Sequence, residues 1–325
     1  MRQAGRYMKE YRELRARHSL LELCRTPELA AAVTLQPIRK LGVDAAIIFA
    51  DLLLPAQAMG MELRFAEGEG PVLSPAIRSA EHVDRLGGVQ DGELGYVAES
   101  VRIVCRELAG KTPVIGFCGA PFTVASYMIE GCGSRTFLNT KRMMYERPEV
   151  WRALLRKLVP VLADYLKSQA EAGASAVQIF DSWVGCLSPE DYREFVLPHS
   201  RELIRCVAEA GVPVIHFGTG TATLLELMRE AGGDVIGIDW RIELGEAWRR
   251  VGFDVAVQGN LDPTALFGPR EMIRARVERI LRSAAGRPGH VFNLGHGILP
   301  ETPVETVQAV VDMVREFRGE ARPQG

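Results

Sequence analysis

Short apolar runs alternate with long amphipathic segments along almost the whole chain. Seven of these runs predict β-strands, at residues 44–50, 113–119, 176–181, 212–218, 234–239, 255–260 and 290–296. Each run is nearly continuous in apolar residues, which is typical of parallel strands buried on both faces. The segments between them predict helices, two of which begin at the cap-like pairs Thr26-Pro27 and Ser188-Pro189. The alternation therefore predicts an α/β fold with a parallel sheet.

A strand–helix alternation of this length fits either a closed barrel or an open, doubly wound sheet. The glycine fingerprint of dinucleotide-binding sheets is missing after the first predicted strand. Polar or ionisable residues instead follow most strands, and in a barrel those strand ends converge on one face. These residues are Asp51, Asp181, Ser182, His216, Asp239, Asn260 and His296. We therefore predict a single-domain (β/α)8 TIM barrel that spans residues 1–325 without an internal linker.

The predicted barrel lacks one strand, because seven strands are evident where the fold needs eight. Residues 61–75 contain glycines and prolines and predict a surface hairpin rather than a barrel strand. The sequence begins with the loop-like residues Met1-Arg2-Gln3, where a first strand would be ending. We therefore expect the first strand to be missing or truncated at the N-terminus, which would leave a gap in the barrel.

Composition and charge narrow the class of protein. No apolar run approaches the roughly 20 residues that a membrane-spanning helix needs, and the N-terminus lacks the apolar segment of a secretory signal. The six cysteines form no CxxC pair, which argues against a structural zinc site or a disulfide framework. The formal net charge is −2 and no basic block is present, so we expect no nucleic-acid or membrane partner. A cytoplasmic location is therefore expected.

Arg2 and Arg6 flank the segment Gln3-Ala4-Gly5 at the N-terminus. The planar guanidinium of arginine suits carboxylates and phosphates, and a glycine lets the backbone approach a ligand. Composition alone favours a solvated tail, so these residues by themselves leave both interpretations open.

Asp51 and Tyr127 also have two interpretations each. Asp51 follows the apolar residues 45–50, so its carboxylate either accepts N–H donors from a ligand or caps the next turn. Tyr127 lies on the predicted helix after the glycine-containing turn at residues 116–123. Its hydroxyl either meets an anionic group or is satisfied within the core.

Ser182, His216 and His296 lie in or just after predicted strands. Ser182 either donates to a carboxylate or closes a turn, and no GxSxG motif around it indicates a serine nucleophile. His296 stands between two glycines on a loop, which favours a role in a site, whereas His216 fits a buried position and a mouth position equally well. No HxH, HxxxH or HxC pair is present, so we expect no bound metal.

Six segments together resemble the uroporphyrinogen decarboxylase family, and they cover essentially the whole chain in order. They read MRQAGRYMKEYR, IIFADLLLPAQAMGM, IGFCGAPFTVASYMIEG, QIFDSWVGCLSPEDY, QGNLDP and FNLGHGILPETP. The first and third look like the two signatures specific to this family. In the family an apolar strand precedes the first signature, and the absence of that strand here agrees with the expected gap.

The resemblance implies decarboxylation of the four acetate side chains of uroporphyrinogen III to give coproporphyrinogen III, in porphyrin and heme biosynthesis. It implies a cytoplasmic homodimer with facing active-site mouths, and chemistry without a metal or an organic cofactor. It assigns the grip on substrate carboxylates to the loop Arg2, Gln3, Ala4, Gly5 and Arg6.

The same resemblance assigns the remaining site residues. Asp51 would lie under the macrocycle and accept the pyrrole N–H groups, which makes it the main catalytic candidate beside Arg2 and Arg6. The polar residues that would line the cleft and contact carboxylates are Tyr127, Ser182 and His296. The apolar neighbours of the ring would be Tyr11, Ile47 and Phe49.

Two other classes of protein remain as alternatives. Zinc-dependent corrinoid and thiol methyltransferases resemble this barrel and hold zinc through a His-x-Cys pair. The matching position here reads His216-Phe217-Gly218, without a cysteine. A non-catalytic tetrapyrrole-binding protein would use the same cleft, although a carrier would have little use for Asp51.

Overall fold

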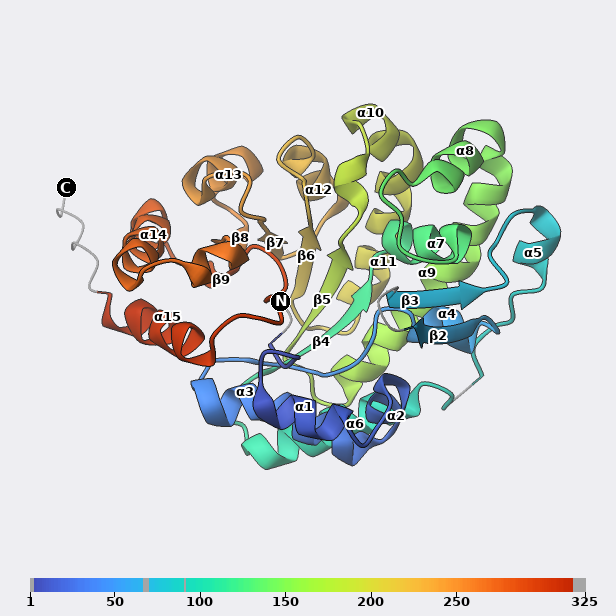
Figure 1. Cartoon of the computed structure of the whole chain (residues 1–325). Coiled ribbons are helices and arrows are strands. Elements are labelled where there is room, and N and C mark those ends of the chain that lie inside the picture. Colours follow the sequence, from blue (N-terminus) through green and yellow to red (C-terminus); the bar gives the residue numbers. More distant parts are fainter. Residues whose placement is uncertain (1–2, 67–69, 91, 318–325) are drawn as a thin grey trace.

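The computed structural model describes residues 3–66, 70–90 and 92–317 (Figure 1). Seven parallel strands form one curled sheet, with helices on its outer side. In sheet order the strands are β1 (Ala46–Ile47), β4 (Val114–Gly119), β5 (Ala176–Asp181), β6 (Val214–Gly218), β7 (Val235–Gly237), β8 (Ala256–Leu261) and β9 (His290–Leu294). All seven coincide with predicted runs, so the predicted α/β barrel fold is confirmed.

Strands β1 and β9 are the two edges of the sheet, and no strand within the described ranges lies between them. This arrangement agrees with the prediction of seven strands rather than eight. Strand β1 is much shorter than the predicted run at residues 44–50, and β4 is its strand partner. Its pairing nevertheless continues to Ile48, whose N–H donates to the carbonyl oxygen of Ile115 at 3.0 Å.

A separate hairpin, β2 (Glu62–Ala66) and β3 (Gly70–Ser74), forms an antiparallel pair outside the curled sheet. The surface hairpin predicted for residues 61–75 is therefore correct. Its second strand contacts helix α7 (Pro121–Glu130), where the Leu73 N–H donates to the Gly131 carbonyl oxygen at 2.7 Å. The hairpin thus supports the C-terminal end of the helix that carries Tyr127.

The remaining helices form the outer layer and the N-terminal segment (Figure 1). They are α1 (Lys9–Arg15), α2 (Leu20–Arg25), α3 (Pro27–Leu41), α4 (Leu54–Ala58), α5 (Ala80–Asp84), α6 (Gly95–Leu108), α8 (Leu138–Glu146), α9 (Pro148–Glu171), α10 (Pro189–Asp191), α11 (Leu197–Ala208), α12 (Leu225–Ala231), α13 (Leu244–Val251), α14 (Arg270–Ser283) and α15 (Val304–Glu316). Neighbouring helices pack in pairs around the sheet, among them α3 on α6, α9 on α11 and α14 on α15.

Both predicted helix starts are present. Ser188 caps α10, because its hydroxyl oxygen accepts a hydrogen bond from the Asp191 N–H at 3.1 Å. Helix α3 begins with Pro27 at its first position, although the side chain of Thr26 makes no capping bond. In the described parts of the chain, no helix combines the length and the apolar character needed to cross a bilayer.

The main core lies between the sheet and the long helix α9. Trp151 of this helix is fully buried, and its indole Nε1 donates to the Phe195 carbonyl oxygen at 2.9 Å. Truncating a buried tryptophan of this kind to alanine typically costs about 3–5 kcal/mol. The core thereby fixes the outer helices against β4 and β5, from which much of the candidate site is built.

Candidate active site

Side chains along a strand alternate between the inside of the barrel and the helix layer. Gln258 Nε2 on β8 donates to Gln178 Oε1 on β5 at 3.4 Å, although β5 and β8 are not neighbours in the sheet. This contact crosses the barrel interior and so identifies the inward face. On β5 that face continues from Gln178 to Phe180, and then to the half-buried Ser182 just beyond the strand.

Three inward phenylalanines form an aromatic floor below the strand ends. The ring of Phe180 lies 5.5 Å from that of Phe117 on β4 and 5.8 Å from that of Phe217 on β6. His296, on the loop after β9, follows at 6.3 Å from Phe217. A floor of this kind suits a flat, largely apolar ring system whose polar groups lie at its border.

Asp51 lies beyond the C-terminal end of β1 and is half-buried. Its Oδ1 accepts a hydrogen bond from the Leu53 N–H at 2.9 Å, which is the turn-capping contact that the sequence allowed. A turn contact and a ligand contact do not exclude each other, since a carboxylate offers about four lone-pair sites. Two residues earlier, Phe49 packs edge-on against Tyr11 at 5.8 Å, so the predicted apolar neighbours Phe49 and Tyr11 are brought together.

Tyr127 reaches the same region from helix α7 and is half-buried. Its ring lies 5.8 Å from that of Trp183, the residue next to Ser182. The ring of Phe137 also packs against Trp183, with the two ring centres 5.6 Å apart. The structure therefore brings Tyr127 into contact with Trp183, the residue that follows Ser182, although the two aromatic residues are far apart in the sequence.

Asp181 points away from the mouth, into the helix layer, and is fully buried. The Thr123 hydroxyl donates to Asp181 Oδ1 at 2.7 Å, and the Trp183 N–H approaches the same hydroxyl oxygen at 3.3 Å. Burial raises the pKa of Asp181 to about 7, partly offset by the bond from Thr123. This residue thus joins the end of β5 to helix α7 and does not line the mouth.

His216 also lies on the outward face of its strand and is fully buried. Burial lowers its pKa to about 4, so the imidazole is neutral at physiological pH. Of the two positions that the sequence left open for His216, the buried one is correct. Among the residues that the structure describes, no three His, Cys, Asp or Glu side chains come together in a way that could hold a metal ion.

The N-terminal loop is described from Gln3 onward, so the predicted contact residue Arg2 lies outside the described residues. Arg6 is exposed, as a side chain that meets a ligand from solvent would be. It borders an open groove of about 520 Å³ on this side of the molecule. The groove is lined by Arg6, Tyr11, Arg12, Arg15, Ala16, Pro300 and Glu301.

Gln3 uses its side chain to hold the free edge of β1. Its Nε2 donates to the Ala45 carbonyl oxygen at 2.7 Å, and its Oε1 accepts from the Ile47 N–H at 2.9 Å. Ala4 and Gly5, which follow, are buried. The loop predicted to grip a ligand is therefore attached to the barrel through Gln3.

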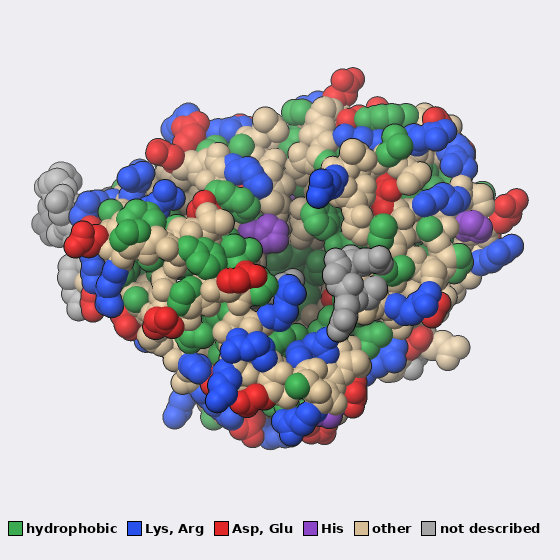
Figure 2. All heavy atoms as spheres, viewed as in Figure 1, with side chains coloured by type: hydrophobic (Ala, Val, Ile, Leu, Met, Phe, Trp, Pro, Cys, Tyr) green, Lys and Arg blue, Asp and Glu red, His purple; other side chains and the backbone are tan. Residues whose placement is uncertain are grey.

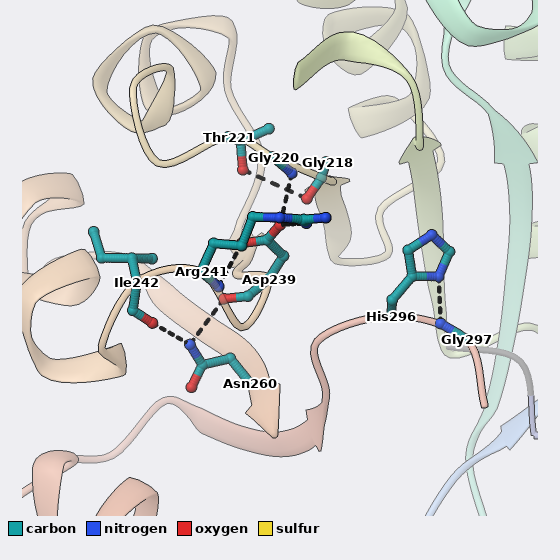
Figure 3. A network of polar contacts seen from close by, with 9 residues as sticks. All are labelled: Gly218, Gly220, Thr221, Asp239, Arg241, Ile242, Asn260, His296 and Gly297. Atoms are coloured by element: carbon teal, nitrogen blue, oxygen red, sulfur yellow. Dashed lines mark hydrogen bonds and ion pairs between the residues drawn. The ribbon is translucent and has the colours of Figure 1, made fainter. Parts of the chain in front are cut away.

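A polar network surrounds Asp239, beyond the end of β7 (Figure 3). Asp239 is 1% exposed, and its Oδ2 accepts from the Gly220 N–H at 2.6 Å and from Arg241 Nη1 at 2.5 Å. Its Oδ1 accepts from the Arg241 N–H at 3.0 Å. Asn260, another predicted strand-end residue, donates through Nδ2 to the carbonyl oxygens of Asp239 and Ile242, at 2.9 and 2.7 Å. Both residues therefore organise loops at the mouth.

The loops that follow β5 and β6 touch through their backbones. A β-carbon added to Gly185 would lie 2.2 Å from the carbonyl oxygen of Thr219, which is too close for any side chain. Gly220, with a left-handed φ of 73°, turns its N–H toward Asp239. The loops after β5, β6 and β7 are thus joined to one another.

Sequence reasoning missed the aromatic floor, Trp183, Trp240 and Arg241. Aromatic residues within apolar runs are indistinguishable from core residues unless the inward face of each strand is known. Trp240 and Arg241 directly follow the predicted strand end at Asp239, and this position alone could have indicated that they lie near the site. Figure 2 shows this side of the molecule, with a central hollow that contains hydrophobic side chains and has Lys and Arg side chains around it.

Two solved structures share the fold over most of the chain. A methyltransferase from Methanosarcina mazei covers 91% of this chain and 87% of its own, with a TM-score of 0.78 and 22% identity. A putative vitamin-B12 independent methionine synthase from Listeria monocytogenes covers 98% of this chain and 96% of its own, with a TM-score of 0.64 and 12% identity. At these identities the likeness shows the barrel fold alone.

Two curated proteins are far more similar to this chain in sequence than these solved structures are. The chain is 57% identical to the uroporphyrinogen decarboxylase of Solibacter usitatus, over 98% of this chain and 92% of that protein. It is 58% identical to the uroporphyrinogen decarboxylase of Carboxydothermus hydrogenoformans, over 98% of this chain and 91% of that protein. The family model described as uroporphyrinogen decarboxylase (URO-D) matches residues 1–317. The chain therefore belongs to the uroporphyrinogen decarboxylase family.

Proposed function

We propose that this protein is a carboxy-lyase that converts uroporphyrinogen III to coproporphyrinogen III in porphyrin and heme biosynthesis. The observation that carries this proposal is the aromatic floor with Asp51, Ser182 and His296 beyond three strand ends at the same end of the barrel. A tetrapyrrole is a broad apolar ring system with N–H groups at its centre and carboxylates at its periphery. The floor suits the ring, and the polar residues suit its centre and its edges.

The reaction requires a place for the electrons that the departing CO2 leaves behind. Protonation of a pyrrole ring carbon beside the acetate makes the ring a cationic iminium. The bond to the carboxylate then breaks, CO2 leaves, and its electron pair neutralises the iminium. Protonation of the resulting methylene and loss of the ring proton give the methyl group. The pyrrole is thus its own electron sink, and this scheme uses no metal or organic cofactor.

Asp51 stabilises the positive charge that develops on the ring. Its carboxylate accepts the pyrrole N–H groups, and the bond from the Leu53 N–H holds it in place before substrate arrives. Preorganised electrostatic contacts of this kind are commonly worth about 3–4 kcal/mol, or 10²–10³ in rate. A carrier without turnover would gain nothing from stabilising this charge, so Asp51 favours catalysis over simple tetrapyrrole binding.

The other site residues bind the carboxylates. Arg2 and Arg6 grip them from the N-terminal loop, which Gln3, Ala4 and Gly5 anchor and shape. Arg2, or a water molecule that it holds, is the candidate proton donor. The cleft residues that contact side-chain carboxylates are Tyr127, Ser182 and His296. Arginine is suited to this task because its fork of N–H groups matches a carboxylate.

A cytoplasmic homodimer is the proposed state of the enzyme. Helix α8 exposes two large hydrophobic side chains, Leu138 at 58% and Tyr145 at 54%. They lie two helical turns apart and so share one face, which supports a protein partner there. Light scattering on the purified protein tests the assembly, and a mass of one chain at micromolar concentration would contradict it.

The activity is tested by incubating the purified protein with uroporphyrinogen III without oxygen and separating the oxidised products by chromatography. Products with seven to four carboxylates are expected, ending at coproporphyrin III. The Asp51→Asn protein, prepared in parallel, is the control for a contaminating enzyme. A folded wild-type protein that yields no product would contradict the proposal.

A further inference from the structure

Arg241 is held in one orientation by two contacts at the barrel mouth. Its Nη1 forms an ion pair with Asp239 Oδ2 at 2.5 Å, and its guanidinium carbon lies 4.0 Å from the centre of the Trp240 ring. Asp239 thus holds one edge of the guanidinium, while Trp240 covers one face. An arginine restrained in this way loses less conformational freedom when it binds an anion than a mobile one does.

Asp239 does not depend on Arg241 alone for its hydrogen bonds. The backbone N–H groups of Gly220 and of Arg241 itself also donate to its two oxygens. The exposures of the pair differ sharply, because the side chain of Asp239 is 1% exposed and that of Arg241 is 48% exposed. The carboxylate is therefore a buried anchor, and the guanidinium presents its outer part to solvent.

The anchored guanidinium lies beside the candidate active site. The Trp240 ring that it covers is 6.2 Å from the ring of His296, and His296 borders the aromatic floor at Phe217. The guanidinium carbon of Arg241 lies 4.0 Å from the centre of the Trp240 ring, so Arg241 and His296 both pack against Trp240. In Figure 3 the guanidinium end of Arg241 extends toward the side on which His296 lies.

Other arginines on the neighbouring helix α13 differ in what they bind. Arg249 places two of its nitrogens on the Glu246 carboxylate, and Arg250 places two on that of Glu226. Arg241, by contrast, gives a single side-chain bond within the described residues, to Asp239, and places its guanidinium against the face of Trp240. Its remaining N–H groups match the fork that a second carboxylate accepts.

We propose that Arg241 binds a peripheral carboxylate of the macrocycle, beside the carboxylate contact of His296. The assignment rests on the proposed function, because it takes the ligand to be a poly-carboxylate tetrapyrrole. The carboxylate belongs either to an acetate, which the reaction removes, or to a propionate, which remains in the product. Both have the same chemistry, and the product distinguishes them.

The test compares Arg241→Gln and Arg241→Lys with wild type, with Arg249→Gln as a matched loss of one positive charge. The KM for uroporphyrinogen III is expected to rise about tenfold or more in Arg241→Gln, with kcat changed less than about threefold. Arg241→Lys recovers part of the loss, since it keeps the charge without the fork. Arg249→Gln keeps the KM of wild type.

Binding of the stable oxidised porphyrins, followed by fluorescence, separates this inference from the proposed function. Loss of affinity in Arg241→Gln for both uroporphyrin III and coproporphyrin III assigns the contact to a propionate. Loss for uroporphyrin III alone assigns it to an acetate. These titrations apply even if the wild-type protein shows no turnover, in which case the proposed function fails and the carboxylate contact is still tested.

Unchanged KM and unchanged porphyrin affinity in a folded Arg241→Gln protein would overturn the inference, as would an equal loss in Arg249→Gln. If Arg241→Gln does not fold, Arg241→Lys decides, because it retains a cation beside Asp239. A folded Lys variant with wild-type KM and affinity would then show that the fork of Arg241 does not bind substrate.

Discussion

The side chain of Gln3 occupies the free edge of strand β1, where its Oε1 accepts a hydrogen bond from the Ile47 N–H at 2.9 Å. Its Nε2 completes the contact by donating to the Ala45 carbonyl oxygen at 2.7 Å. One amide side chain thus makes the two hydrogen bonds that a neighbouring strand would make at this point. The position of the N-terminal arginine loop consequently depends on the edge of the sheet.

Replacing Gln3 by alanine is expected to lower the free energy of unfolding by roughly 1–2 kcal/mol, because each of two half-buried hydrogen bonds contributes about 1 kcal/mol. Urea unfolding measures this change. The KM for uroporphyrinogen III should rise as well, since Arg6 lies on the same loop. Gln308→Ala is the control, because that side chain bonds to Asp312 within α15 and should change stability by less than about 0.5 kcal/mol. Equal stability of the two variants would contradict the role given to Gln3.

Asp51→Asn is expected to leave the fold intact and to lower kcat by about 10²–10³, because the neutral amide no longer stabilises a positive charge on the pyrrole. Circular dichroism and thermal unfolding verify the fold, and anaerobic turnover measures the loss. Binding of uroporphyrin should weaken much less than kcat falls. A folded variant with wild-type kcat would remove Asp51 from the mechanism.

Burial of Asp181 should make stability fall as the pH rises from about 4 to about 7. Burial raises the pKa of this carboxyl from 3.8 to about 7, so in this range the native state holds a proton that the unfolded state has lost. The contribution is complete below pH 3.8 and is gone above pH 7. Asp181→Asn lacks this dependence, so its stability relative to wild type should increase across the range, by at most about 1.4 kcal/mol for each unit of raised pKa. Urea unfolding at several pH values measures the difference, and a difference that does not vary with pH would refute the effect.

Burial of His216 acts in the opposite direction. Its pKa is lowered from 6.5 to about 4, so between these values the unfolded state binds a proton that the native state excludes. Stability contributed by the neutral imidazole is therefore present above pH 6.5 and is lost as the pH falls toward 4. The variant His216→Gln should show a shallower loss in acid. The slope should not vanish, because burial also lowers the pKa of His199 to about 4. An unchanged acid slope would count against this account.

The strands were predictable because each is an apolar run between helices, and a parallel strand covered on both faces must have that composition. The C-terminal ends of the strands follow from the same pattern, which is why Asp51, Ser182 and His296 could be named as strand-end residues, whereas their specific roles in a site were inferred from the family resemblance. The apolar pattern does not show whether a polar residue at a strand end points into the mouth or into the helix layer. Asp181 points into the helix layer, and the alternation of side chains along a strand predicts the opposite direction for the adjacent Ser182.

The inward face could be assigned only from contacts between distant segments. The bond between Gln178 and Gln258 crosses the barrel and fixes it for β5. The meeting of Tyr127 with Trp183 likewise depends on how α7 packs against β5, which no local pattern records. Gln3 is a similar case, because a polar residue in a loop-like segment gives no sign that it completes a sheet edge.

The backbone contact at Gly185 restricts how far one side of the mouth can move. With no space for a side chain against Thr219, and with the next loop bonded to Asp239, the wall formed by these three loops cannot widen without breaking several contacts at once. This side of the opening is therefore a rigid wall rather than a movable lid. A macrocycle is therefore expected to enter and leave without movement of this wall, and the carboxylate contacts proposed above would then set its residence time.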